Sequence, residues 1–298
     1  MRHIKIWFPK YFTEAHRKLE EGQALVEELY KFGIDSQWAL TSDCSFIFCG
    51  STWESSGVDQ TRVAHPDIPV VHYNWDLYPF QLVERTDYVR PNPEIWDPYI
   101  TSLKTCRDIW VPSYCTTLRT REFTGRESTI IKTAIHPWES DGVSTGDYAV
   151  DVVRCYPDFC SGEVQQGCVA TSIPLVQSQN TLQWDEFRST ISNCKFMVSG
   201  QFEASTGGLT LLEGLWHGKP SLLSNSPRHG GVDYLGNRAT YFQWDNQLLL
   251  RKALIQMADS TPVIDVDEAR TWITKEYSNF AMAERMAKRF WELYDESN

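Results

Sequence analysis

Short apolar runs alternate with helix-like segments along most of the chain, and this alternation is the feature that most restricts its fold. Residues 4–8 (IKIWF) form the first apolar run, and a segment with leucines at helical spacing follows over residues 14–33. Gly33 is suited to end that helix, because glycine adopts left-handed backbone conformations at little cost. Strands that alternate with helices predict an α/β fold with mostly parallel sheets and helices on their faces.

The rest of the chain continues the pattern. Further helices are expected at residues 97–106, 185–191, 207–218 and 267–296. Residues 226–236 (SPRHGGVDYLG) are expected to be a loop. Further strands are expected at residues 36–40, 44–50, 69–76, 108–113, 129–135, 148–157, 168–178, 195–200 and 219–225.

The length favours two domains, since 298 residues is close to the ~250–300 at which single hydrophobic cores stop growing. Residues 136–147 (HPWESDGVSTGD) are rich in Gly, Ser and Asp and show no periodicity, which is typical of a connection between domains. We therefore place the boundary near Gly142, with one domain over residues 1–142 and a second over residues 143–280.

Charge and cysteine usage narrow the class of partner and compartment. The 39 Asp and Glu exceed the 28 Lys and Arg, for a net charge of −11, and basic residues form no run of five. This balance disfavours nucleic acid as a partner without excluding it. The eight cysteines form no C-x-x-C pair, and the N-terminus lacks the apolar stretch of a signal peptide, so we expect reduced thiols, a cytoplasmic protein and no membrane span. Cys155, Cys160 and Cys168 fit no standard zinc spacing.

Residues 202–227 (FEASTGGLTLLEGLWHGKPSLLSNSP) carry the strongest chemical signal. A helix that begins at Gly207 and Gly208 presents backbone N–H groups and a partial positive charge, which suit a diphosphate, and Thr206 adds a hydroxyl. Two glycines also remove the Cβ atoms that would hold a phosphate away from the backbone. Glu213 follows about 8 Å along the helix, where a carboxylate accepts hydrogen bonds from a ribose diol. The alternative is a plain helix with a loose start and a solvent-facing Glu213.

This stretch resembles the nucleotide-binding signature of the GT-B retaining glycosyltransferases, the large E-x7-E family that includes sucrose-phosphate synthases and many mannosyl- and glucosyltransferases. The signature of that family consists of a Glu, a Gly-rich turn, a second Glu, then Gly-x-Pro and a strand. In this chain, GGLTLLEGLWHGKPSLLSN corresponds to the part of the signature that starts at the Gly-rich turn. Residues 108–125 and 152–159 extend the likeness. The resemblance implies two Rossmann-like domains that face each other across a cleft, an N-terminal acceptor domain and a C-terminal donor domain. It also implies that a C-terminal helix, residues 281–298, packs back toward the N-terminal domain.

The resemblance also assigns roles to single residues. Glu203 takes the place of the first Glu, which contacts the donor sugar, although the strict spacing falls on Ser205, which is the alternative. Arg154 matches an Arg that binds the diphosphate. Asp76 ends the predicted strand 69–76, where His72, Asn74 and Trp75 also stand near the presumed cleft, and is the second candidate catalytic residue. The cofactor-binding set is thus Arg154, Ser205, Thr206, Gly207, Gly208 and Glu213.

The chain departs from the family pattern at two further places. The family's Lys partner to the Arg does not follow Arg154, and Lys219 lies too far along to replace it. The Gly-Gly loop often found after the first strand is missing, since FPKYFTEAH stands there. Arg228 and His229, in the expected loop, are further candidates for phosphate binding; an ordinary surface loop is the alternative.

These residues predict transfer of a sugar from a nucleotide-sugar donor to a hydroxyl acceptor, with retention of the anomeric configuration. No HExxH or P-loop string supports a hydrolase or NTPase. With the implied GT-B fold we expect catalysis without a metal, in which the helix dipole and basic groups stabilise the leaving diphosphate. Two alternatives remain open: a non-catalytic nucleotide-sugar binding module, and, because STGGLTLLEG is similar to phage glycosyltransferase strings, a phage-type enzyme that glycosylates DNA bases.

Overall fold

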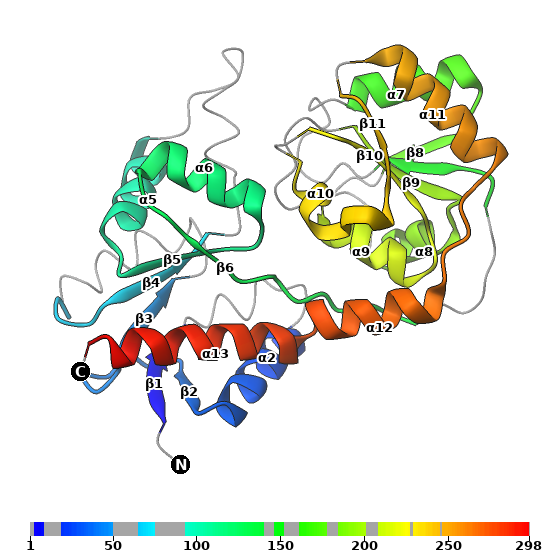
Figure 1. The fold of residues 1–298 in the computed structure, drawn as a ribbon. Coiled ribbons are helices and arrows are strands. Elements are labelled where there is room, and N and C mark those ends of the chain that lie inside the picture. Colours follow the sequence, from blue (N-terminus) through cyan, green and yellow to red (C-terminus); the bar gives the residue numbers. More distant parts are fainter. Residues whose placement is uncertain are drawn as a thin grey trace. The chain divides into compact units, whose positions relative to one another are not determined.

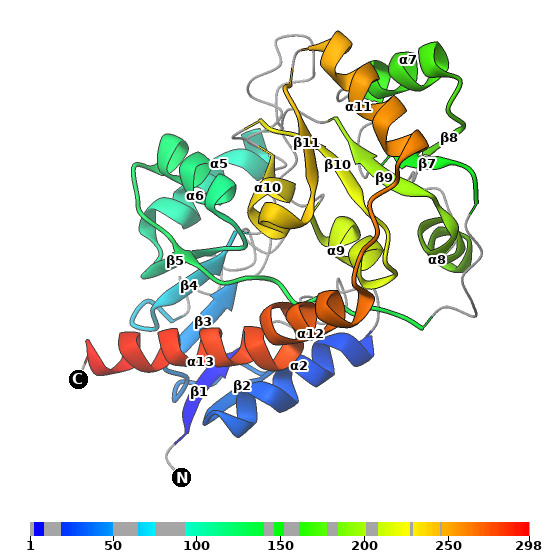
Figure 2. The same cartoon turned by 45° about the vertical axis from the view of Figure 1, so that its right-hand side comes forward.

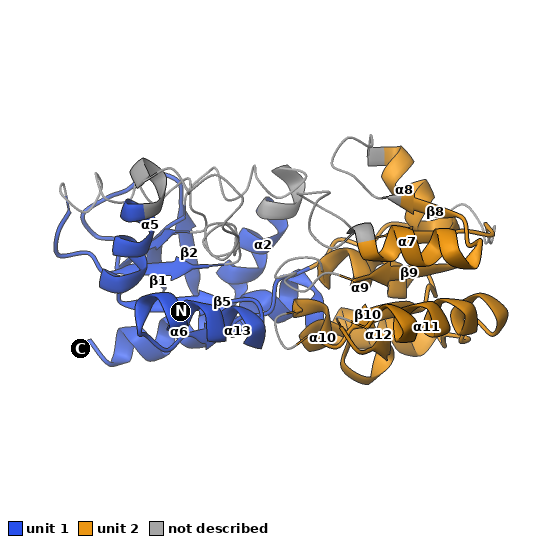
Figure 3. Ribbon diagram, turned by 90° about the horizontal axis from the view of Figure 1, so that it is seen from above, with its two compact units in different colours: residues 1–134, 276–298 blue, residues 135–275 orange. Residues whose placement is uncertain are grey.

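A computed structural model gives the fold of the protein as two compact units (Figure 3). Unit 1 comprises residues 1–134 and 276–298, and unit 2 comprises residues 135–275. The division therefore falls just before the Gly/Ser/Asp-rich segment and again near the end of a C-terminal helix. The structure describes residues 3–8, 19–49, 65–74, 93–139, 146–151, 161–177, 184–200, 208–226, 229–244 and 246–297.

Unit 1 is built on a six-stranded sheet with the strand order β2-β1-β3-β4-β5-β6, in which every pair of neighbours is parallel (Figure 1). Gly33 ends the first described helix with a φ of 82°, as predicted. The elements are β1 Ile4–Trp7, α2 Leu19–Lys31, β2 Ile34–Gln37, β3 Phe46–Cys49, β4 Val70–Tyr73, α5 Pro93–Thr105, β5 Asp108–Val111, α6 Tyr114–Thr124, β6 Thr129–Ile130 and α13 Asn279–Asp295.

Successive side chains of the unit 1 strands enter two different cores, because a strand points them to opposite faces of the sheet. Phe46 and Phe48 pack in the core that includes residues of α2 and α13, such as Leu29 and Phe290. The intervening Ile47 lies in the other core, with residues of α5 and α6. Both faces of the sheet are thus covered, which explains why the central strand β3 (FIFC) is apolar throughout.

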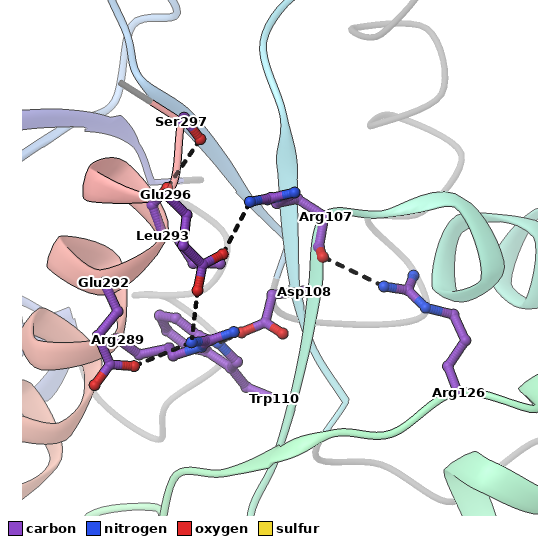
Figure 4. Close-up of polar contacts among 9 residues, drawn as sticks. All are labelled: Arg107, Asp108, Trp110, Arg126, Arg289, Glu292, Leu293, Glu296 and Ser297. Atoms are coloured by element: carbon purple, nitrogen blue, oxygen red, sulfur yellow. Dashed lines mark hydrogen bonds and ion pairs between the residues drawn. The ribbon is translucent and has the colours of Figure 1, made fainter.

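An ion-pair network holds α13 to the start of β5 (Figure 4). Arg289 donates from Nε to Asp108 Oδ2 at 2.7 Å and also pairs with Glu292, while Arg107 pairs with Glu296 at 2.9 Å. The indole N–H of Trp110 donates to the same Asp108 oxygen at 2.8 Å. The last helix of the chain is therefore tied by charge as well as by apolar contacts to the sheet of unit 1.

Unit 2 has a five-stranded parallel sheet with the order β11-β10-β9-β7-β8. Residues of α7 and α11, such as Val164 and Leu254, share one core with Phe196 and Leu222 of the sheet. The elements are β7 Ala149–Asp151, α7 Ser161–Thr171, β8 Leu175–Gln177, α8 Trp184–Asn193, β9 Phe196–Ser199, α9 Gly208–Trp216, β10 Ser221–Ser224, α10 Gly230–Leu235, the 3₁₀ turn η1 Gly236–Arg238, β11 Thr240–Phe242, α11 Gln247–Asp259 and α12 Val266–Tyr277, whose last two residues belong to unit 1.

The structure differs from the predicted elements at three places. The predicted strand 168–178 is helical up to Thr171, where α7 ends with Cys168 buried and Val169 exposed; the chain then turns at Ser172, which has a φ of 56°, before β8. The expected loop 226–236 contains α10. The C-terminal tail is two helices, since Ser278 is extended and caps α13 by accepting a hydrogen bond from the N–H of Ala281.

Candidate functional site

Of the residues predicted to be catalytic or cofactor-binding, only two fall within the described part of the chain. Gly208 is the first residue of α9 and Glu213 lies on the same helix. The roles of the others stay predictions, since these residues lie outside the described ranges: Asp76, Arg154, Glu203, Ser205, Thr206 and Gly207.

The helix α9 begins at the carboxyl edge of the unit 2 sheet. Its preceding strand, β9, lies between β10 and β7 and runs parallel to both, with Ser199 as its last residue. A helix that returns the chain from β9 to the parallel β10 starts where β9 ends, at the edge where α/β folds bind ligands. The N-terminus of α9 therefore directs its partial positive charge to that edge, as the sequence predicts.

Glu213 is buried, with 4% of its surface exposed. It follows Gly208 by five residues, a rise of about 7.5 Å along the helix axis. A carboxylate at this depth is costly unless it is paired or hydrogen-bonded. The burial excludes the alternative of a solvent-facing Glu213, which the sequence alone left open.

The glycines of α9 are required by packing. A Cβ atom at Gly208 would lie 1.8 Å from Cδ2 of Tyr234 on α10, and one at Gly214 would lie 1.8 Å from Sδ of Met197 on β9. Gly214 lets the helix lie directly on the strand. Gly208 lets the Tyr234 ring lie directly on the first turn of α9, so close contact with α10 accounts for this glycine independently of any ligand.

His229, a candidate for phosphate binding, is the N-terminal cap of α10. Its Nδ1 accepts a hydrogen bond from the N–H of Gly231 at 3.0 Å, and its Nε2 lies 2.8 Å from Oγ of Ser199. Burial lowers the pKa of His229 to about 4, so the ring is neutral at neutral pH. Arg228, the neighbouring candidate, lies outside the described residues.

In unit 1, His72 and Asn74 lie inside the protein, with 0% and 1% of their surfaces exposed. The amide of Asn74 accepts a hydrogen bond from the Tyr99 hydroxyl and donates one to Oγ1 of Thr120 at 3.0 Å. The ring of His72 meets the ring of Tyr99 edge-on, and burial lowers the pKa of His72 to about 3. Contacts within unit 1 are thus enough to explain Asn74 without a bound sugar; Trp75 lies outside the described residues.

Lys219 lies at the opposite edge of the unit 2 sheet from the N-terminus of α9. It stands between the end of α9 and the start of β10 and is 4% exposed. Burial lowers its pKa. A side chain at that edge cannot supply the charge of the family's missing Lys, in agreement with the sequence-based expectation.

Within the described ranges, no group of three or more His, Cys, Asp or Glu side chains is arranged to hold a metal ion. The six cysteines found there are free and buried: Cys44, Cys49, Cys106, Cys115, Cys168 and Cys194. Among the helices of those same ranges, none has the length and apolar character needed to cross a membrane.

Comparison with known proteins finds likeness in three dimensions but not in sequence. No family model matches the chain, and no curated protein matches it. A solved sucrose-phosphate synthase from Thermosynechococcus elongatus superposes with a TM-score of 0.69 at 11% identity, over 99% of this chain and 100% of that one. HepE from Anabaena, in complex with UDP and glucose, gives a TM-score of 0.66 at 8% identity, over 98% and 100% of the two chains.

A third solved structure, the lipopolysaccharide outer core galactosyltransferase WaaB without ligand, gives a TM-score of 0.55 at 9% identity and covers 90% of this chain and 80% of that one. The matches span both units, and the parallel sheets agree with two Rossmann-like domains. At these identities the likeness establishes the fold. The chain therefore has the GT-B glycosyltransferase fold, as the sequence predicted.

Proposed function

We propose that the protein transfers a sugar from a nucleotide-sugar donor to a hydroxyl acceptor, with retention of the anomeric configuration. The observation that carries the proposal is the arrangement on α9: a helix N-terminus at the carboxyl edge of a parallel sheet, with Glu213 buried about 7.5 Å along the same helix. A diphosphate suits the first feature and a ribose diol suits the second. One nucleoside diphosphate spans both.

Each predicted residue has a role in this proposal. The N–H groups of Gly207 and Gly208, the Thr206 hydroxyl and the Arg154 guanidinium bind the diphosphate, and Glu213 accepts hydrogen bonds from the ribose. Glu203, or Ser205 in its place, contacts the donor sugar, and Asp76 is the second candidate catalytic residue. Charge that develops on the leaving diphosphate is stabilised by the helix dipole and Arg154. The leaving diphosphate accepts the proton of the acceptor hydroxyl, so a separate base is not needed.

The comparisons support the choice of donor class. HepE has been solved with UDP and glucose and with UDP-glucose, in a fold that covers nearly all of this chain. UDP-sugars are therefore the donors to test first, with GDP- and ADP-sugars beside them. The acceptor is left open, because acceptor selection in such folds resides in loops.

The experiment measures release of nucleoside diphosphate from each donor, with water and with simple glycosides as acceptors. We expect release by the wild-type protein that Glu213→Ala reduces, persistence of that release in EDTA, and a product whose anomeric signal in NMR matches that of the donor. Binding of the donor without turnover would favour a non-catalytic nucleotide-sugar module. An inverted product would contradict the retaining mechanism.

A further inference from the structure

The helix α10 contacts both ends of the segment that joins β9 to α9. One end is Ser199, the last residue of β9, and the other is Gly208, the first residue of α9. His229, the cap of α10, reaches Ser199, and Tyr234 of α10 reaches Gly208. Figures 1 and 2 both show α10 beside α9. A single short helix is thus positioned to set the spacing between the strand and the helix N-terminus.

The first contact has a defined direction. Because Nδ1 of His229 accepts the Gly231 N–H, the neutral ring carries its proton on Nε2, which donates to Oγ of Ser199 at 2.8 Å. Both residues are 1% exposed, so water does not compete for this hydrogen bond. The imidazole therefore links the end of β9 to the chain that follows β10, through two hydrogen bonds that use both ring nitrogens.

The second contact is one of close packing. The space that a Cβ at Gly208 would fill is already occupied by the Tyr234 ring, which is 2% exposed. A Cβ at Gly231 would lie 2.9 Å from Cδ1 of Leu211, so the first turn of α10 also lies tightly on α9. Neither helix can move along the other without opening this contact.

We propose that α10 is a positioning element for the donor diphosphate, with His229 and Tyr234 as positioning residues that hold the N-terminus of α9 in place relative to the end of β9. The inference rests on the proposed function, since it assumes that the diphosphate binds at that N-terminus. Backbone N–H groups favour an anion only when they are held within about 0.5 Å of the right place. The link acts through this geometry and not through contact with the ligand.

The test distinguishes the hydrogen bond between His229 and Ser199 from the capping of α10 by His229. Ser199→Ala removes the partner of His229 and leaves the cap, whereas His229→Asn keeps a side chain that is favoured as a cap but is too short to reach Ser199. UDP, GDP and ADP are titrated calorimetrically into each folded variant, and the unfolding midpoint without nucleotide is recorded in parallel. We expect each substitution to weaken the binding of whichever nucleotide the wild type binds by about 5- to 10-fold. The double variant should lose little more, because both changes break one interaction.

Matched controls come from the opposite edge of the same sheet. Ser221→Ala removes another buried hydroxyl of unit 2, and His217→Asn removes another histidine there; both should leave nucleotide affinity unchanged. Ser199→Thr keeps the hydroxyl and should therefore bind the nucleotide with the wild-type affinity. If the variants lower the unfolding midpoint while nucleotide affinity stays at the wild-type value, α10 is only structural and the inference is overturned. If the wild type binds none of the three nucleotides, the proposed function fails and the inference fails with it.

Discussion

The two units complete the carboxyl edges of their sheets in different ways. In unit 1, Asn74, which follows β4, is hydrogen-bonded to Tyr99 of α5 and Thr120 of α6. In unit 2, backbone approaches side chain directly, with glycines at 208 and 231 that let α9 and α10 pack against each other. At the first edge, Asn74 forms its hydrogen bonds within unit 1. At the second edge, close packing fixes a helix N-terminus.

The difference indicates that the two edges have different roles. A side chain that pairs within its own unit, as Asn74 does, contributes structure, while an edge fixed by close packing presents a rigid helix end to a ligand. If this is right, changes at the unit 2 edge should alter nucleotide binding, and changes at Asn74 and its partners should alter stability alone. The four predictions that follow run from the largest expected effect to the smallest.

Acidification should weaken both units, because each contains a fully buried neutral histidine. The pKa of His72 is lowered to about 3 and that of His229 to about 4, from an ordinary value of 6.5. The unfolded chain takes up protons below about pH 6.5 and the folded chain does not, so the free energy of unfolding falls as the pH drops from about 6.5 to about 4. The expected loss between pH 7 and pH 5 is about 1–2 kcal/mol for each histidine.

Chemical denaturation at a series of pH values measures this loss. His72→Phe keeps an aromatic ring against Tyr99 and should reduce the pH dependence of unit 1 only, whereas His229→Asn should reduce that of unit 2 only. A pH dependence that neither substitution changes would show that these histidines do not cause it.

Gly208→Ala should destabilise unit 2 and weaken nucleotide binding together. The new methyl group would overlap the Tyr234 ring, and overpacking of this kind costs about 1–3 kcal/mol. Gly214→Ala is the matched control: it overlaps Met197 and should lower stability, but it lies away from the helix N-terminus and should spare affinity. Equal losses of affinity in the two variants would argue against a special role for the Gly208 contact.

Glu213→Ala should weaken binding of the donor nucleotide by about 1–3 kcal/mol, the range for loss of charge-assisted hydrogen bonds. Calorimetric titration of the folded variant measures the change, and Glu213→Gln, which keeps the volume, controls for a cavity in the helix interior. Affinity that stays at the wild-type value in folded Glu213→Ala would refute the ribose role.

Arg289→Ala should have the smallest effect, about 1 kcal/mol on the stability of unit 1, because its ion pair with Asp108 is partly exposed to water. Trp110 would still donate to the Asp108 carboxylate. Nucleotide affinity should not change. A clear loss of nucleotide affinity in Arg289→Ala would contradict the proposal that nucleotide binding depends on the unit 2 edge.

The sequence predicted the fold where apolar runs coincide with strands. The strand–helix–strand order over β9, α9 and β10 was confirmed, as was the GT-B fold. The helix α10 was missed because Gly230 and Gly231 disfavour a helix in isolation, whereas in the fold a Cβ at Gly231 would lie 2.7 Å from Cε1 of His229 and 2.9 Å from Cδ1 of Leu211. The predicted strand 168–178 was wrong up to Thr171, since a short apolar run does not by itself distinguish a strand from the last turn of a helix.

The link between Ser199 and His229 was beyond sequence reasoning, because it joins residues 30 positions apart that match no motif. The one available signal was that apolar Val232, Tyr234 and Leu235 follow the Gly-Gly pair, which favours a short packed helix over a surface loop. The burial of Glu213 also needed the structure, since its place in the motif was equally compatible with a solvated face.

A thermal-shift screen with UDP, GDP, ADP, TDP and CMP tests the central claim most directly. A ligand at ~100 times its Kd adds about 2.7 kcal/mol of stability, which raises the unfolding midpoint by several degrees. The account predicts such a shift with one nucleoside diphosphate, and a smaller shift with the same nucleotide in Glu213→Ala. No shift with any nucleotide, in a protein that unfolds cooperatively, would contradict the assignment of a nucleotide site to α9.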